Sequence, residues 1–469
     1  MLFVTDPFLI IKKIIAELFR KKHYLAPSFI FSQRLINFLY TYFVIQILTQ
    51  FEFANYSILV YVCSFTLQIL KYGYDLRFQR LIFKLNRRKS YNKLKVIYSK
   101  YSTAVLALSS AATVISALLY AVFFENVKSL RLFDFVSIFM ALFGLFGLSL
   151  ITTVSYAISN FYIIAITLIL QFVCYVAALV CLQYIGSQEA FFIYSLAASI
   201  PVFYILSRYY GLRVLGHELP KIFNIKQLKF RQQYIVYVNN TSINFFQIVL
   251  VSFVAHVSPL WISEYRVLQS LHTMISLLPI AFGGYLFNAH LPESRRSSSH
   301  SNFISVHFYL IICGFAILFH KSIVYFFPKY SLAIEQTIDL YLILNIVTVI
   351  SNSFLFASFS KINIRAYIYL IAFFFPLVII FLYYRSPQSL REFIYVDFSV
   401  QILFYICLLL SSSRSIINLT DVIHFSYFLI LFVLVSSFSP GANTTGLILI
   451  IVSVFYLFLF HFNNSFRKR

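Results

Sequence analysis

Two groups of polar side chains fall inside otherwise apolar stretches of the sequence, at spacings that place each group on one face of a helix. Arg34 and Asn37 are three residues apart. Asn240, Asn244 and Gln247 fall at positions i, i+4 and i+7. A guanidinium binds anionic groups such as phosphates, and amides exchange hydrogen bonds with hydroxyls. We predict that both groups line a wet cavity for an anionic, hydroxyl-rich molecule. The alternatives are a structurally paired or surface-reaching Arg34 and hydrogen bonds between helices.

A third group follows the same spacing later in the chain. Arg266, Gln269 and His272 lie at i, i+3 and i+6, and Glu264 is a candidate partner for Arg266. This group sits near the predicted outer end of a membrane helix. Two interpretations stay open for Arg266: it binds a ligand in the cavity, or it extends to the membrane surface.

Motifs for enzymatic or nucleotide-driven chemistry are missing from the sequence. It contains no GxxxxGK[ST], GxGxxG or HExxH motif, and no cysteines at metal-ligand spacing. We therefore predict no catalytic residues, no metal and no cofactor, and a protein that is not an enzyme. Ion coupling would require a buried acid. Asp339, Asp397 and Asp421 fall in or near apolar stretches, and the sequence does not decide between a proton and sodium.

The elements that must position these side chains are membrane helices. The 469 residues are 61% hydrophobic and 11% charged, with a mean hydropathy of +0.84, whereas soluble domains carry roughly 25% charged residues. We predict an all-α polytopic membrane protein with about 14 transmembrane helices, in two pseudo-repeated six-helix bundles plus a C-terminal pair. The predicted spans are 24–48, 55–70, 104–124, 133–157, 161–182, 190–207, 234–257, 263–290, 303–327, 338–358, 366–384, 393–410, 422–438 and 446–462.

The distribution of basic residues orients these spans. Of the 37 Lys and Arg residues, 29 fall in the segments predicted inside and 5 in those predicted outside, which puts both termini in the cytoplasm. The net charge of +22 is explained by this bias, so we predict no nucleic-acid partner. The basic loop 71–100 is expected to lie on the membrane surface. The outside loops are short and leave no room for an extracytoplasmic domain.

The chain divides into five predicted segments. They are a basic lead-in (1–23), an N-terminal helical bundle (24–207), a basic cytoplasmic linker (208–233), a C-terminal bundle (234–410), and a helix pair with a basic tail (411–469). The five cysteines all lie in apolar stretches and are predicted to be packing residues without disulfides.

One element occurs twice. The stretch FEFANYSILVYVCSFTLQILKYGYDLRFQR (51–80) and the stretch WISEYRVLQSLHTMISLLPIAFGGYLFNAH (261–290) share a polar residue followed by Tyr and a late Gly. Each is interpreted as an outside turn followed by a span running inward. A parallel repeat of this kind is typical of transporters, although apolar spans of similar composition also match by chance.

These stretches resemble the polysaccharide exporters, the Wzx-type O-antigen flippases of the multidrug/oligosaccharidyl-lipid/polysaccharide superfamily. The second-span signature is matched by Ala54, Tyr56, Ser57 and Gly73. Its counterpart in the second half is filled by Glu264, Tyr265, Pro279 and Gly284, and the stretches 326–346 and 353–381 add further matches. The chain departs from the family in having only 11 Gly and 11 Pro residues.

The resemblance implies a flippase that moves undecaprenyl-diphosphate-linked oligosaccharides by alternating access, for O-antigen or capsule-type polysaccharide, in a bacterial inner membrane. It implies a cavity between the two bundles, lined by the first, second, seventh and eighth spans. Besides the lipid-linked oligosaccharide and membrane lipids, it implies a polysaccharide polymerase and chain-length proteins as partners. The alternatives are an O-antigen polymerase or a membrane glycosyl or acyl transferase, and a drug or cation exporter of the same superfamily. The candidate cavity residues are Arg34, Asn37, Asn240, Asn244, Gln247, Arg266, Gln269 and His272.

Overall fold

The computed structural model describes most of the chain as long helices. The described residues are 22–70, 81–82, 84–124, 130–158, 161–185, 189–210, 231–289, 309–342, 345, 363–384, 387–411 and 448–451. The described part contains helices and turns and no strand, as predicted from the sequence.

Two helices, α3 and α10, begin earlier than the sequence analysis predicted. The hydroxyl of Thr49 and the carboxylate of Glu52 form a capping box: the Thr49 N–H donates to Glu52 Oε2 (2.8 Å) and the Glu52 N–H to Thr49 Oγ1 (3.4 Å). Helix α3 therefore begins at Gln50, and 51–54 are helical rather than part of a turn, which corrects the sequence prediction. Likewise Pro259 is the first residue of α10, so 261–262 are helical too.

The N-terminal half is a bundle of six helices. They are α2 (Lys22–Ile47), α3 (Gln50–Leu70), α5 (Tyr91–Phe124), α6 (Leu132–Ile158), α7 (Phe161–Ile185) and α8 (Ala190–Tyr210). Helix α8 packs on both α6 and α7, α5 packs on α3 and α6, and α2 packs on α7. Helix α5 starts at Tyr91, so the last part of the basic loop continues directly into the span instead of lying apart from it.

The C-terminal half is described in less of its length. It contains α9 (Arg231–Val257), α10 (Pro259–Ala289), a bent pair formed by Tyr309–Leu318 and α12 (His320–Phe326), the turn η3 (Pro328–Tyr330), a helix over 331–342, α14 (Ile364–Tyr384) and α15 (Leu390–Leu410). The bent pair turns by 74° at its break. Helices α9, α14 and α15 pack on one another.

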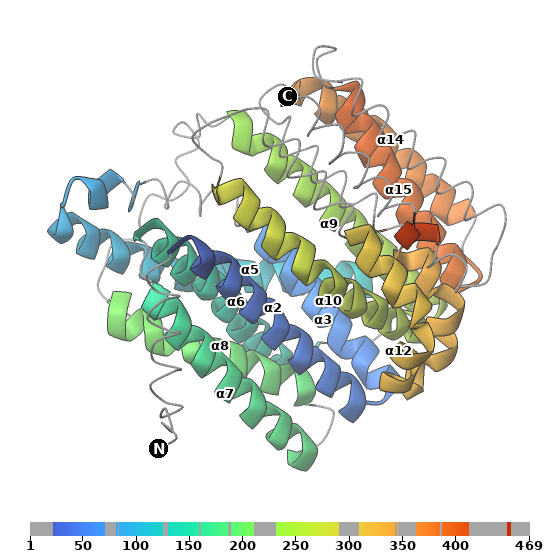
Figure 1. The fold of residues 1–469 in the computed structure, drawn as a ribbon, viewed down its shortest axis with the longest axis horizontal. Coiled ribbons are helices and arrows are strands. Elements are labelled where there is room, and N and C mark those ends of the chain that lie inside the picture. Colours follow the sequence, from blue (N-terminus) through green and yellow to red (C-terminus); the bar gives the residue numbers. More distant parts are fainter. Residues whose placement is uncertain are drawn as a thin grey trace, which may run out of the picture.

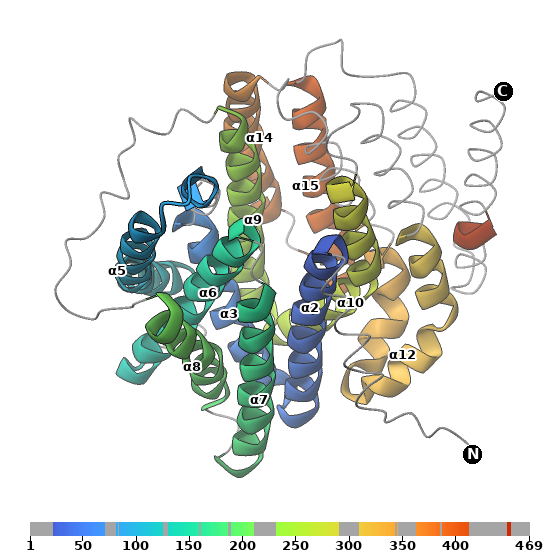
Figure 2. The same cartoon turned by 60° about the vertical axis from the view of Figure 1, so that its left-hand side comes forward.

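The two halves meet along α2 and α3 on one side and α9 and α10 on the other. Helix α10 packs on both α2 and α3, and α2 lies between α7 and α10, as Figures 1 and 2 show. Helix α3 also packs on α9. The first, second, seventh and eighth predicted spans are therefore the helices that line the boundary between the halves.

At one end the boundary is closed by what we call the turn clamp, residues 46–50 and 326–330. Gln46 Nε2 donates to the carbonyl of Phe326 (2.7 Å), and Gln50 Nε2 to that of Lys329 (2.5 Å). In return Lys329 Nζ donates to the carbonyls of Gln46 (2.5 Å) and Leu48 (2.9 Å), next to the C-terminus of α2. The positive-inside count assigns this end to the outside.

Five described helices are long and apolar enough to cross a membrane, and the bent pair would be a sixth. The five are α3 and α5 to α8. The short spans predicted at 55–70 and 190–207 are thus full helices. The total of fourteen, the division into five segments and the repeat stay predictions. Most of 412–469, with the last two predicted spans, lies outside the described residues, as do Gly73 and most of the linker.

Candidate functional site

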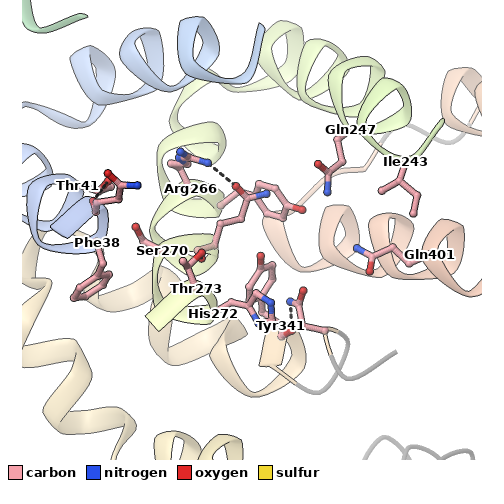
Figure 3. A pocket seen from close by; sticks show the side chains of 14 residues that line it. Phe38, Thr41, Ile243, Gln247, Arg266, Ser270, His272, Thr273, Tyr341 and Gln401 are labelled. Atoms are coloured by element: carbon pink, nitrogen blue, oxygen red, sulfur yellow. Dashed lines mark hydrogen bonds between the residues drawn. The ribbon is translucent and has the colours of Figure 1, made fainter. Parts of the chain in front are cut away.

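A polar cavity of about 320 Å³ lies between the two halves. Helix α2 forms one wall; α9, α10, the segment 341–345 and α15 form the others (Figure 3). Its lining is rich in amides, hydroxyls and aromatic rings: Asn37, Phe38, Thr41, Ile243, Gln247, Tyr265, Arg266, Gln269, Ser270, His272, Thr273, Tyr341, Asn345 and Gln401. Among the described lining residues, Arg266 supplies the one permanent charge, and none is a carboxylate.

Helix α10 contributes more polar lining residues than any other element, because one of its faces is polar over two turns. Arg266, Gln269, Ser270 and Thr273 lie at i, i+3, i+4 and i+7, so they follow one another along the side of α10 that meets α2. Thr41 of α2 lies about 7.5 Å along the helix from Gln46, since each residue advances a helix by about 1.5 Å. The turn clamp therefore covers the cavity from roughly one and a half helical turns away.

Arg266 is held between the two halves by an aromatic ring and an amide. Its guanidinium carbon lies 5.0 Å from the centre of the Tyr61 ring of α3, in cation–π geometry. Its Nη1 donates to Gln269 Oε1 (3.1 Å), the same oxygen that accepts the Tyr61 hydroxyl (2.5 Å). Arg266 Nε is buried and has no protein partner among the described residues. The guanidinium is therefore oriented and forms no ion pair with a described acid, and a guanidinium in this state can bind an anion.

Behind the cavity wall lies a buried carboxylate. Asp397 of α15 accepts hydrogen bonds on Oδ2 from the Tyr265 hydroxyl (2.5 Å) and from Gln401 Nε2 (3.2 Å). Tyr265 and Gln401 both line the cavity, whereas Asp397 does not. Tyr265 also packs edge-on against Tyr341 and Phe393, which fixes its ring.

His272 is fixed by two tyrosines from the segments that follow α10. Its Nδ1 lies 2.7 Å from the hydroxyl of Tyr309, which is fully buried, and its ring stacks edge-on to that of Tyr341. Arg34 of α2 interacts electrostatically with His272, which places Arg34 next to the cavity although it does not line it.

The structure thus brings together five of the eight candidate residues: Asn37, Gln247, Arg266, Gln269 and His272. Arg34 and Asn244 are outside the lining, although Asn244 lies on α9 between the lining residues Ile243 and Gln247. The side chain of Asn240 lies outside the described residues. Of the two interpretations of Arg266, the geometry does not match extension to the membrane surface, because its guanidinium contacts Tyr61 and Gln269.

Several lining or supporting residues escaped the sequence analysis. Tyr61, Tyr341 and Gln401 are such residues. Tyr265 was noted only as part of the repeated signature, and Asp397 only as an acid in an apolar stretch. The sequence did contain a signal for Asp397 and Gln401, because they are a polar pair at i and i+4 inside an apolar helix. The tyrosines carried no such signal among 35 in the chain.

The fold is similar to that of solved transporters. The crystal structure of the eukaryotic MATE transporter AtDTX14 superposes with a TM-score of 0.52 at 16% sequence identity, covering 84% of this chain and 96% of that one. The chain has a MATE-like fold. A second solved structure, called protein A, gives a TM-score of 0.51 at 14% identity over 84% of this chain and 94% of its own. No family model and no curated protein matches the sequence.

MATE transporters are members of the multidrug/oligosaccharidyl-lipid/polysaccharide superfamily, the one indicated by the sequence resemblance. The chain is a multi-pass membrane protein with a MATE-like fold. At these identities the comparison defines the fold and leaves the cargo to be argued from the cavity.

Proposed function

We propose that the protein is a flippase for lipid-diphosphate-linked oligosaccharides, acting by alternating access of its two halves. The observation that carries the proposal is Arg266, which lines a polar cavity walled by both halves, is oriented by Tyr61 and Gln269, and has no ion pair with a described acid. A diphosphate is the kind of anion that such a guanidinium binds. The surrounding amides and hydroxyls of Asn37, Thr41 and Gln247 match the hydroxyls of a sugar.

The size of the cavity restricts which part of the cargo it holds. About 320 Å³ is at the lower end of the roughly 300–1,000 Å³ typical of small-molecule sites. We expect the cavity to hold the diphosphate and the sugar next to it, while the lipid tail and the remaining sugars extend beyond. The turn clamp closes the end assigned to the outside, so this state would receive its cargo from the cytoplasm.

The cellular setting is part of the same proposal. The cargo would be an undecaprenyl-diphosphate-linked repeat unit for O-antigen or capsule-type polysaccharide. The protein would act in a bacterial inner membrane with cytoplasmic termini, without catalytic residues or cofactor, and with a polysaccharide polymerase and chain-length proteins as partners. The five cavity candidates, together with Arg34, Asn240 and Asn244, would be its binding residues.

The proposal is tested by measuring translocation in proteoliposomes. The probe is a fluorescent polyprenyl-diphosphate oligosaccharide whose outer-leaflet fraction is read by a membrane-impermeant quencher. Arg266→Gln should slow translocation about 100-fold, because removing one partner of a buried charge interaction costs about 2–5 kcal/mol. Arg131→Gln is the matched control, since Arg131 pairs with Asp134 away from the cavity. Equal translocation by Arg266→Gln and the native protein would refute the proposal.

A drug or cation exporter is equally compatible with the fold. It makes the opposite prediction, because a fixed cation in the cavity repels a cationic dye. In vesicles loaded with a cationic dye, an exporter should transport the dye, and Arg266→Gln should transport it faster. Dye transport without movement of the diphosphate probe would show that the protein is a drug or cation exporter and not a flippase.

A further inference from the structure

The carboxylate of Asp397 is buried and only half satisfied. Asp397 is 5% exposed, and the Tyr265 that bonds it is 2% exposed. Its Oδ2 accepts both hydrogen bonds, from Tyr265 and Gln401. Its Oδ1 is buried with no partner among the described residues. One oxygen of the carboxylate is therefore occupied twice while the other is left without a donor.

No cation among the described residues neutralises this group. The described ion pair of the structure is Arg131 with Asp134, far along the chain from Asp397. Among the described residues, the titratable groups that face Asp397 are Tyr265 in contact, and Tyr341 and Tyr61 at longer range. Arg266 is next to Tyr265 but directs its guanidinium to Tyr61 and Gln269. A buried carboxylate without a cation is costly when ionised, and taking up a proton removes that cost.

We propose that Asp397 is a proton-binding site of this transporter, with the proton carried on Oδ1. The step is the addition of one proton to the carboxylate to give a carboxylic acid, and no other bond forms or breaks. The two hydrogen bonds to Oδ2 stay in place, so Tyr265 and Gln401 hold the side chain in both forms. The proton reaches Asp397 from the cavity, because both of these residues line it.

The proton site is linked to the cargo site through helix α10. Tyr265 contacts the proton site and Arg266, the next residue, faces the cargo site. An ionised Asp397 adds a negative charge behind the cavity wall and opposes a diphosphate, and protonation removes it. Protonation and anion binding therefore favour each other, and by reciprocity each tightens the other by the same factor. This linkage rests on the proposed function, whereas proton binding itself does not.

Proton binding is tested without cargo. Infrared difference spectra of the full-length protein in nanodiscs, recorded between about pH 5 and pH 9, should show a carboxylic-acid C=O band that Asp397→Asn abolishes. Glu392→Gln is the matched control, since Glu392 is an exposed acid on the same helix and should leave that band in place. A native protein without the band, or a band that Asp397→Asn retains, overturns the proposal.

A second variant guards against misfolding of Asp397→Asn. Tyr265→Phe keeps the carboxyl group and removes one hydrogen bond to it, so the band should persist with a displaced midpoint. An unchanged midpoint contradicts the assignment. Repeating the titration with choline in place of sodium separates a proton from an alkali cation: a transition that requires sodium overturns the proton assignment.

The link to the cargo is read by binding of a short polyprenyl diphosphate. The probe should bind about tenfold tighter at the acid end of the titration, and Asp397→Asn should make its affinity independent of pH. The chain's one tryptophan, Trp261, lies one turn before Tyr265 on α10, so its fluorescence should follow the same transition. A pH transition with no binding of the probe at any pH would refute the flippase function and leave the proton site standing.

Discussion

Two helix contacts in this protein differ in kind: α6 on α8 within the N-terminal half, and α2 on α10 between the halves. In the first, backbones approach so closely that a Cβ on Gly144 would lie 2.8 Å from the backbone of Ala198, and one on Gly147 would lie 2.1 Å from Val202 Cγ1. In the second, the helices border a polar cavity, and beyond it the C-terminal end of α2 is joined to α12 and η3 by hydrogen bonds from side chains to carbonyls. Small residues allow the first kind of contact, and amides and a lysine provide the second.

The difference indicates which contact moves. A close-packed contact between glycines and a facing backbone has one good geometry, so α6 and α8 should behave as a rigid unit. The turn clamp uses exposed donors, which water can replace when the contact opens. We infer that the boundary between the halves opens and closes while each half keeps its own packing, which is the motion that alternating access requires.

The largest expected effect comes from disturbing the rigid contact. Gly144→Val places a branched side chain against the backbone of Ala198 and should lower the free energy of unfolding by on the order of 3 kcal/mol. The measurement is thermal unfolding of the purified protein. Val136→Phe is the control, since Val136 is exposed on the same helix and should leave stability nearly unchanged. Equal stability in both variants would show that the contact adjusts more freely than its geometry indicates.

An intermediate effect is expected at the turn clamp. Lys329→Met removes a charged donor from the carbonyls of Gln46 and Leu48 without touching the core, and should favour opening about tenfold. We expect Thr41→Cys in the cavity to be labelled about ten times faster by an impermeant thiol reagent added outside, in a background lacking the exposed Cys181.

Lys321→Met is the control for this measurement, because Lys321 is an exposed lysine on α12 outside the clamp. A labelling rate that stays constant in Lys329→Met would mean that the clamp does not hold the boundary shut.

The smallest effect is expected where α3 supports Arg266. Tyr61→Phe keeps the ring below the guanidinium and loses the hydrogen bond to Gln269, so binding of a polyprenyl-diphosphate probe should weaken about twofold. Tyr61→Leu loses the ring as well and should weaken binding about fivefold. Equal affinities of the two variants would mean that the cation–π contact does not contribute to binding and that Gln269 alone orients Arg266.

Much of this fold was predictable because its signals are local. The long apolar stretches predicted the helices of the N-terminal half. The spacing of polar residues predicted the face of α10 that lines the cavity. The turn before α3 was predicted wrongly although Thr49 and Glu52 stand at capping-box spacing, a signal that was present in the sequence and was not used.

The parts that sequence alone could not give depend on contacts between distant segments. Tyr61 meets Gln269, and Tyr265 meets Asp397, across 208 and 132 residues of chain. Helical periodicity says which face a residue occupies, but not which helix that face meets. For the same reason the sequence left Arg266 between two interpretations, and only its neighbours from α3 decide where its guanidinium lies.

The polarity of the cavity helices has a consequence for how the protein enters its membrane. Helices α6 and α7 carry no charge in their middles and are among the five described helices apolar enough to cross on their own, whereas α2 and α10 are not among them. A central arginine disfavours insertion by about 2.5–3.5 kcal/mol. Arg34 imposes this on α2, which leaves the ribosome before α7 and α10, the helices that pack on it. We expect α2 to be retained in the bilayer only in their company, so the arginine in the middle of α2 also affects the order in which the bundle is assembled.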